Sequence, residues 1–400
     1  METNYTIQNI LQKSDWKNNV QSGSKPILNA IEKCRTKELG FHLQKCDDAT
    51  CNAIKHIYHS CRNRHCPNCG FVKKEEWIEA RMRELFPCSY FHIVFTIPHQ
   101  LNAICMGNRK EFFNLMLEAS SYTLLKFSKD EKMLGAVPGI ISVLHTWGQQ
   151  LSFHPHIHCI VSGGGLTKDG NFKIASKAKS GILFPVKAMK VVYRAFFMRR
   201  LNQEVRNGNI TLTQEQLFNF AELKDELFKK EWIVYAKRPF GGPQQVIEYL
   251  GRYVNKVAIS NQRIKKMDDD TVTFEYKDYS DASKTKLMSL THQEFLRRFE
   301  QHILPFRFTK IRSYGLYANN KRKKRVAKIF EKQKWPPHPK PMKVPLEIRL
   351  LEAFCIDITK CPTCKTGTMK LMQIVMPIKK ERNDALDDWS VIQKKILEEK

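Results

Sequence analysis

Three histidines stand at every second position in the segment HPHIH, residues 154–158. In a β-strand, residues two apart point to the same face, so His156 and His158 share one face of the predicted strand. Two imidazole rings on one face can bind a single metal ion. His154 has the same parity, but the proline after it lies at the strand edge and makes its geometry less regular. The alternative is a set of ordinary core or surface histidines.

A second group of reactive side chains lies in EYLGRYVNK, residues 248–256. On a helix, Tyr249 and Tyr253 are four residues apart and share a face, and Lys256 lies three residues beyond on the same side. A divalent ion held by the histidines can polarise a scissile phosphate. A tyrosine oxygen can then attack that phosphate and form a covalent phosphotyrosyl intermediate. The alternative is a pair of core tyrosines beside an exposed lysine.

The cysteines indicate a separate metal site near the N-terminus. Seven of the twelve cysteines lie between Cys34 and Cys88, and a reducing compartment favours metal sites or buried thiols over disulfides. Two pairs with spacings C-x4-C and C-x2-C suit one tetrahedral zinc ion with a structural role, whereas unligated buried thiols are the alternative. The predicted zinc ligands are Cys46, Cys51, Cys66 and Cys69, with His56, His59, Cys61 and His65 as alternative donors.

A smaller group of cysteines lies near the C-terminus. Cys355, Cys361 and Cys364 supply only three thiols, and the last two form the segment CPTC. Because a closed structural zinc site uses four ligands, the sequence leaves open whether a second zinc ion binds there.

The charge of the chain indicates its partner. Lys and Arg number 67 against 40 Asp and Glu, so the 400-residue chain carries a net charge of +27. Such an excess of positive charge favours binding to a polyanion, and nucleic acid is the leading candidate for the partner. The alternatives are a solvated basic surface and contact with anionic lipid.

No apolar run approaches the roughly 18 residues of a membrane span, and the polar N-terminus lacks a signal-peptide pattern, so we expect a cytoplasmic, nucleoid-associated protein without a membrane partner.

A basic and aromatic segment, PFRFTKIRSYGLYANNKRKKR (305–325), is a candidate DNA-binding extension. Cationic side chains can pair with phosphates, and interleaved aromatic rings can stack on unpaired bases. The alternative is an amphipathic element with a solvated basic face. The predicted DNA-binding residues are Arg307, Lys310, Arg312, Tyr314, Lys321, Arg322, Lys323, Lys324 and Arg325.

The order of the predicted strands and helices indicates an α+β protein with a central antiparallel sheet, because the two kinds of element mix without a regular βαβ alternation. Residues 90–102 predict a buried strand closed by Pro98, residues 109–129 predict a helix, and glycines 163–165 are expected to end the histidine strand. We expect six regions: a helical segment (1–39), a zinc-binding domain (40–84), a catalytic domain (85–260) with an insertion around 170–245, a basic extension (261–334), a proline-rich linker (335–345) and a cysteine-containing tail (346–400).

Three of these motifs, taken in order, resemble a known enzyme family. FTIPHQLN (95–102), HPHIHCIV (154–161) and YLGRYVNK (249–256) are similar to the three motifs of HUH endonucleases. With CRNRHCPNC (61–69) ahead of them, the chain resembles a rolling-circle, two-tyrosine transposase of the insertion sequence ninety-one family. The resemblance covers roughly residues 40 to 325. It implies an HUH endonuclease-like domain preceded by a small zinc-binding module.

The resemblance assigns roles to the residues of the motifs. It implies that His156 and His158 bind the catalytic metal, Mg²⁺ or Mn²⁺, while Tyr249 and Tyr253 are nucleophiles and Lys256 assists near the phosphate. Single-tyrosine relatives retain the position of Tyr253, so that tyrosine is the better supported of the two. HUH sites usually have a third metal ligand, and His92, His145 and Glu248 are candidates.

The expected function is cleavage and rejoining of single-stranded DNA at element ends and target through a 5′-phosphotyrosine intermediate. Because the chain contains no Gly-Lys dipeptide, it lacks a phosphate-binding loop of the G-x4-G-K-[ST] type, and a host helicase is the expected partner for strand displacement. The alternatives are a replication initiator or relaxase of the same chemistry, which the zinc module argues against, and a noncatalytic zinc-containing DNA-binding protein.

Overall fold

The computed structural model of the chain describes residues 5–175, 181–237, 245, 251, 257–336, 344–354 and 357–377. The chain forms two compact units. The first contains Met1–Glu32 and Arg62–Val344, and the second contains Lys33–Cys61 and Pro345–Lys400. Each unit is therefore built from segments that are far apart in the sequence.

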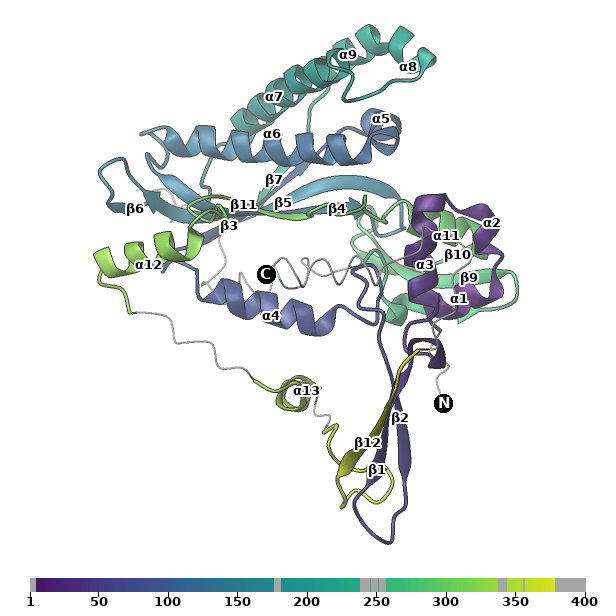
Figure 1. Cartoon of the computed structure of the whole chain (residues 1–400). Helices are drawn as coiled ribbons and strands as arrows, with labels where there is room; N and C mark the ends of the chain where they lie inside the picture. Colours follow the sequence, from purple (N-terminus) through teal and green to yellow (C-terminus); the bar gives the residue numbers. More distant parts are fainter. Residues whose placement is uncertain are drawn as a thin grey trace. The chain divides into compact units, whose positions relative to one another are not determined.

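A six-stranded antiparallel sheet is the centre of the first unit (Figure 1). The strand order is β11-β4-β5-β3-β7, and β6 pairs with β5. The two longest strands, β4 and β5, are central, and their register pairs His145 with His156. The strands are β3 (Tyr90–Thr96), β4 (Val137–Trp147), β5 (Phe153–Leu166), β6 (Phe172–Ile174), β7 (Val234–Lys237) and β11 (Ile311–Gly315).

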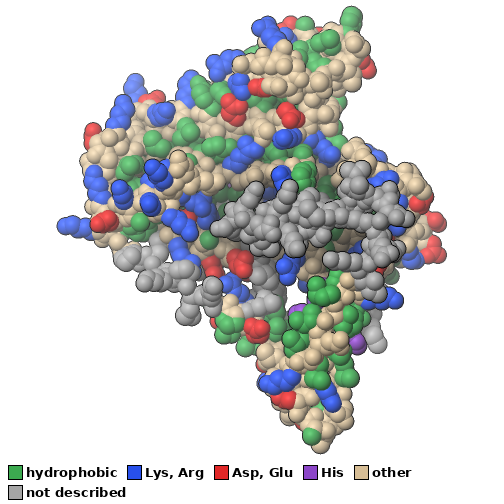
Figure 2. Space-filling model, viewed as in Figure 1, with side chains coloured by type: hydrophobic (Ala, Val, Ile, Leu, Met, Phe, Trp, Pro, Cys, Tyr) green, Lys and Arg blue, Asp and Glu red, His purple; other side chains and the backbone are tan. Residues whose placement is uncertain are grey.

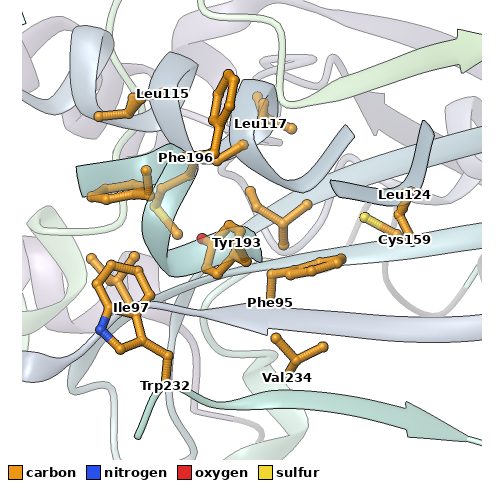
Figure 3. Close-up of a cluster of buried hydrophobic side chains, with 14 of the residues drawn as sticks. Phe95, Ile97, Leu115, Leu117, Leu124, Cys159, Tyr193, Phe196, Trp232 and Val234 are labelled. Atoms are coloured by element: carbon orange, nitrogen blue, oxygen red, sulfur yellow. The ribbon is translucent and has the colours of Figure 1, made fainter. Parts of the chain in front are cut away.

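Helices cover one face of this sheet (Figure 1). The side chains of Ile93, Phe95, Ile157 and Cys159 alternate along β3 and β5, so they share this face, and all four are buried. Figure 3 shows Phe95 beside Tyr193 of the helical layer, and Cys159 beside Leu124 of the same layer. The helices of this region are α5 (Asn102–Gly107), α6 (Arg109–Lys129), α7 (Val186–Arg206), α8 (Gln214–Phe218) and α9 (Phe220–Lys229).

The opposite face of the sheet carries a second apolar cluster and the histidines. Ile141, Val143 and Ile160 belong to this cluster, together with buried residues of α12 (Arg322–Lys332). Side chains of α4 (Phe71–Met82) pack against the same cluster. The register places Val143 opposite His158, so the apolar cluster and the histidines occupy neighbouring parts of one face.

The remainder of the first unit consists of small elements. A three-stranded antiparallel sheet has the order β10-β9-β8. Short 3-10 helices occur at Ser22–Ser24, His99–Leu101 and Asn261–Arg263. The other elements are α1 (Ile7–Lys13), α2 (Trp16–Asn19), α3 (Lys25–Glu32), β8 (Ile264–Met267), β9 (Thr271–Asp278), β10 (Lys284–Thr291) and α11 (His292–Glu300).

The second unit contains a three-stranded antiparallel sheet of order β12-β1-β2. Its strands are β1 (Phe41–Cys46), β2 (Ile54–Tyr58) and β12 (Met369–Val375), and a 3-10 helix (Lys37–Leu39) and α13 (Leu346–Phe354) belong to the same unit. β1 therefore lies between its hairpin partner β2 and a strand from the C-terminal region of the chain.

The α+β class with antiparallel sheets is confirmed. The predicted helix at 109–129 is α6, and the predicted strand before Pro98 is β3. The glycines at 163–165 do not end β5, which continues to Leu166, because the absence of Cβ atoms lets the backbone of β4 and the ring of Phe172 approach closely. Among the described residues, no helix is both long and apolar enough to cross a membrane.

The two units differ from the predicted domain boundaries. The segment 40–84 was expected to form one zinc-binding domain, but it is divided at Cys61. The segment 346–400 was expected to be a separate tail, but its described part pairs with β1 through the backbone hydrogen bonds of β12. Most of the predicted proline-rich linker 335–345 lies outside the described residues, so the linker stays a prediction.

Candidate catalytic metal site

Three histidines converge on the sheet face opposite α6 and α7. His156 and His158 lie two residues apart on β5, and His145 on β4 is paired with His156 in the register. One candidate ligand nitrogen from each ring lies within 4.8 Å of the other two. Three imidazole nitrogens at this spacing are a donor set that suits a divalent transition-metal ion.

Hydrogen bonds fix the orientation of two of these rings. Nδ1 of His156 lies 2.6 Å from the backbone oxygen of His154, and Nδ1 of His158 lies 2.8 Å from Nε2 of His92. If each Nδ1–H donates, Nε2 becomes the ligand nitrogen of both His156 and His158. Metal-binding histidines commonly donate their other N–H in this way.

Burial lowers the pKa of two histidines of this face, His156 and His92. Desolvation lowers the pKa of His156 to about 4. Desolvation, assisted by the nearby charge of Lys237, lowers the pKa of His92 to about 3. A neutral His92 can accept the hydrogen bond from His158, and a neutral His156 can donate its lone pair to a metal without first losing a proton.

The structure separates the candidates for the third ligand. His145 joins the histidine pair, whereas His92 lies behind His158 with its ring stacked at a centroid distance of 5.0 Å. His92 therefore orients the ring of His158 through their hydrogen bond and is not a member of the three-nitrogen group. Glu248 lies outside the described residues. Only the strand register identifies His145, because nothing in its local sequence distinguishes it from His92.

The predicted nucleophiles Tyr249 and Tyr253, and the predicted helper Lys256, also lie outside the described residues. One residue between the two tyrosines is described: Gly251 is buried, and a Cβ atom there would collide with the side chain of Ile78 on α4. Because side chains of α4 pack against the apolar cluster beside the histidines, Gly251 belongs to the same side of the sheet as the three-histidine group.

A small basic pocket lies next to the histidines. Trp147 stacks on His145 at a centroid distance of 4.6 Å and lines the pocket together with Arg64, His302 and Lys310. Burial, reinforced by the charge of Arg64, lowers the pKa of Lys310 to about 8. Sequence reasoning identified Lys310 but missed Arg64 and Trp147, which lie 246 and 163 positions away in the chain and join it only through the fold.

The predicted DNA-binding residues divide into exposed cations and internal contacts. Lys321, Lys323 and Lys324 are exposed at the start of α12, and Arg307 is also exposed. Lys and Arg side chains gather around the position of α12 at the left of Figure 2. The helix buries Val326, Ile329 and Phe330, so the proposed alternative of an amphipathic element describes its packing correctly.

The other members of this set make structural contacts. Arg322 forms an ion pair with Glu84 at 3.1 Å, and Arg325 donates to backbone oxygens that include that of Leu316 at 2.9 Å. Arg312 hydrogen-bonds Asn114. Tyr314 is partly buried and packs against the main core.

The structure groups the predicted zinc ligands differently from the sequence prediction. Cys46 and Cys51 belong to the second unit, where they lie with Cys361 and Cys364, and the four sulfur atoms are within 4.8 Å of one another. Cys66 and Cys69 belong to the first unit, in the turn before α4. The sequence prediction paired neighbouring motifs along the chain, whereas the pairing of β12 with β1 brings a distant motif to Cys46 and Cys51.

The structure also shows where several of the alternative zinc donors lie. Cys61 lies in the second unit, where its backbone N–H donates to the Sγ of Cys34 at 3.4 Å. His59 Nδ1 lies 2.9 Å from the backbone oxygen of Leu39. His65 lines the basic pocket of the first unit. Cys355 lies outside the described residues.

Two family models match the chain. Residues 139–325 match a family described as "Putative transposase", and residues 5–97 match the "Transposase zinc-binding domain". The first range contains the histidine strands, and the second contains the N-terminal cysteines.

Two proteins named as transposases are similar to this chain over longer ranges of its sequence. A protein named putative transposase from Sinorhizobium fredii is 37% identical over 363 residues, which cover 89% of this chain and 90% of that protein. The transposase for insertion sequence element IS801 of Pseudomonas savastanoi pv. phaseolicola is 28% identical, with 83% and 79% covered.

Solved structures with some likeness include the conjugative relaxase TrwC in complex with oriT DNA. Its metal-bound form is 14% identical, with a TM-score of 0.23, and the match covers 34% of this chain and 55% of the relaxase chain. The sequence relatives carry the assignment: this chain belongs to the insertion sequence ninety-one family of transposases.

Proposed function

We propose that this transposase cleaves and rejoins single-stranded DNA at element ends through a 5′-phosphotyrosine intermediate, with a divalent metal held by His145, His156 and His158. The observation that carries the proposal is the convergence of three imidazoles on one sheet face. When bound there, Mg²⁺ or Mn²⁺ would polarise the scissile phosphate and stabilise the charge that develops on it.

The proposed covalent step uses a tyrosine of the segment 248–256. The phenolic oxygen of Tyr253 loses its proton and bonds to phosphorus, the bond from phosphorus to the 3′ oxygen breaks, and that oxygen takes up a proton and leaves as a 3′-hydroxyl. In the joining step a 3′-hydroxyl attacks the phosphotyrosine and releases the tyrosine. Tyr249 would serve a second cleavage, and Lys256 would stabilise phosphate charge. The burial of Gly251 beside α4 supports placing this segment near the histidines.

The proposed path of the DNA begins at the basic pocket. Arg64 and Lys310 would contact a backbone phosphate beside the cleavage site, because both cations line the pocket that Trp147 connects to His145. Arg307, Lys321, Lys323 and Lys324 would contact phosphates farther along the strand. A host helicase would supply the displaced strand, because the chain contains no phosphate-binding loop of the nucleotide-hydrolysing type.

The zinc-binding domain would hold and orient the DNA without taking part in cleavage. Cys66 and Cys69 remain candidate ligands of a zinc ion, with His65 as an additional donor in the same unit.

A covalent adduct tests the proposal directly. The purified protein is incubated with end-labelled single-stranded DNA from the element flanks and Mg²⁺ or Mn²⁺, and a denaturing gel is examined for labelled protein. We expect an adduct that Tyr253→Phe or Tyr249→Phe alters and that His156→Ala/His158→Ala removes. His154→Ala is the matched control, because His154 lies on the same strand but outside the three-histidine group. Binding without an adduct, across several end sequences, would favour a noncatalytic zinc-containing DNA-binding protein.

A further inference from the structure

We propose that Cys46, Cys51, Cys361 and Cys364 bind one Zn²⁺ ion, and that this ion fastens the C-terminal segment to the N-terminal hairpin of the second unit. The matched zinc-binding domain ends at residue 97, so half of the proposed ligands lie outside it. The site is independent of the proposed DNA cleavage, because it uses none of the histidines.

The sulfur positions fit a tetrahedral metal site. Sγ of Cys46 lies 3.7 Å from Sγ of Cys364, and Sγ of Cys51 lies 3.6 Å from Sγ of Cys361. A tetrahedral ion with Zn–S bonds of about 2.3 Å separates its sulfur ligands by about 3.8 Å. A disulfide would require sulfur atoms about 2.05 Å apart, so the four thiols are spaced for a shared ion and not for oxidation in pairs.

The C-terminal pair lies in a turn shaped to present both sulfurs. The N–H of Cys361 donates to the oxygen of Gly367 at 2.8 Å, and the N–H of Gly367 donates to Sγ of Cys364 at 3.2 Å. Lys365 adopts a left-handed conformation with φ +65°, which turns the chain back toward the first cysteine. Backbone N–H groups directed at a sulfur favour its thiolate form, which is the form that binds zinc.

The N-terminal pair approaches this turn closely. A Cβ atom at Gly367 would collide with Sγ of Cys46, so glycine is the residue that permits the approach. The two segments are also joined by backbone bonds: the N–H of Asp47 donates to the oxygen of Thr368 at 3.0 Å. The four cysteines therefore occupy one compact centre although the pairs are separated by more than 300 residues along the chain.

Burial alone does not account for the docking of the C-terminal segment. Met369 is the one buried residue of β12, and five of its seven residues are exposed. The apolar cluster at this end of the sheet consists mainly of the cysteines themselves, with Met369 and Ala53. A three-stranded sheet with so small a core needs an additional constraint, and a four-thiolate zinc site provides it.

Metal content tests the site in the full-length protein. We expect Cys361→Ser/Cys364→Ser to lose one zinc equivalent per chain, and Co²⁺-loaded wild type to show the intense thiolate charge-transfer absorption of a tetrahedral site, weakened in the variant. Cys105→Ala is the control, because Cys105 is buried in the first unit and is not a member of the four-cysteine group. Unchanged zinc content and an unchanged Co²⁺ spectrum in the double variant would overturn the proposal.

A second measurement needs no cysteine substitution. A protease site inserted into the linker 335–345 allows the chain to be cut in its folded state. We expect the C-terminal fragment to co-elute with the remainder in the presence of zinc and to separate after a strong chelator is added. Gly367→Ala should weaken the association at limiting zinc, whereas Gly107→Ala, with no atom within 4 Å of the added Cβ, should not. A fragment that stays bound after complete removal of zinc, or leaves while zinc is retained, would contradict the fastening role.

Discussion

The histidine site and the cysteine site are positioned by different means. The histidines lie on two paired strands of a deeply packed sheet, and Ile157 and Cys159, which alternate with them, are fully buried on the opposite face. The cysteines lie at the end of a sheet whose apolar side chains are largely exposed, such as Ile374 at 50%. The core therefore holds the three histidines in place without a metal, whereas we expect the proposed cysteine site to depend on zinc for much of its stability.

Removing the histidine pair is the strongest test of this comparison. We expect His156→Ala/His158→Ala to reduce DNA cleavage by roughly a thousandfold or more, because the polarising metal contributes several kcal/mol of transition-state stabilisation. The thermal midpoint should change little, because the core on the other face is retained. Cleavage rates and melting curves of the same preparation measure both effects. Cleavage at the wild-type rate would remove the metal site from the mechanism.

Matched truncations on the two sheets compare their cores. Ile157→Ala removes a fully buried side chain between the two histidines and should cost about 2–5 kcal/mol of unfolding free energy in the first unit. Ile374→Ala, on the exposed sheet, should change the unfolding free energy of the second unit by less than about 0.5 kcal/mol. Hydrogen exchange of β5 and β12, followed by mass spectrometry, measures the two effects separately. Comparable losses at both positions would show that the cysteine-bearing sheet has a core of similar strength.

Substitution of His92 tests whether its hydrogen bond to His158 strengthens metal binding. We expect His92→Leu to weaken Mn²⁺ binding by about 10–100-fold, because it removes the acceptor that orients the ring of His158. His92→Gln retains an acceptor oxygen and should recover part of the affinity. Titration calorimetry measures both variants. If His92→Leu binds Mn²⁺ as wild type does, the orienting role is excluded and only packing remains.

The sequence predicted local patterns well and distant associations poorly. The alternation of His156 and His158 and the helix 109–129 depend on near neighbours, and both are found in the structure. The position of His145 depends on the register between β4 and β5, which residue spacing does not encode. The grouping of Cys46 with Cys364 depends on a pairing 318 residues apart, so the prediction joined each cysteine pair to the nearest one instead. The tyrosines lie outside the described residues, so their placement stays a prediction.

The basic pocket supplies the smallest expected effect, a pH dependence of DNA binding. Burial lowers the pKa of Lys310 to about 8, so its ammonium is mostly charged at pH 7 and mostly neutral at pH 9. A bound phosphate favours the charged form of Lys310, so at alkaline pH the lysine must take up a proton when DNA binds. The affinity for single-stranded DNA should therefore fall roughly fivefold from pH 7 to pH 9.

Lys310→Arg separates this titration from other alkaline effects. A guanidinium stays charged over the whole range, so the variant should bind with nearly constant affinity, while Lys324→Arg, on the exposed start of α12, should keep the wild-type slope. Fluorescence anisotropy at constant ionic strength measures the three profiles. An unchanged slope in Lys310→Arg would mean that the phosphate does not contact this pocket. A flattened slope would place a DNA phosphate beside Lys310, and the stacking of Trp147 on His145 would then connect the DNA backbone to the metal site.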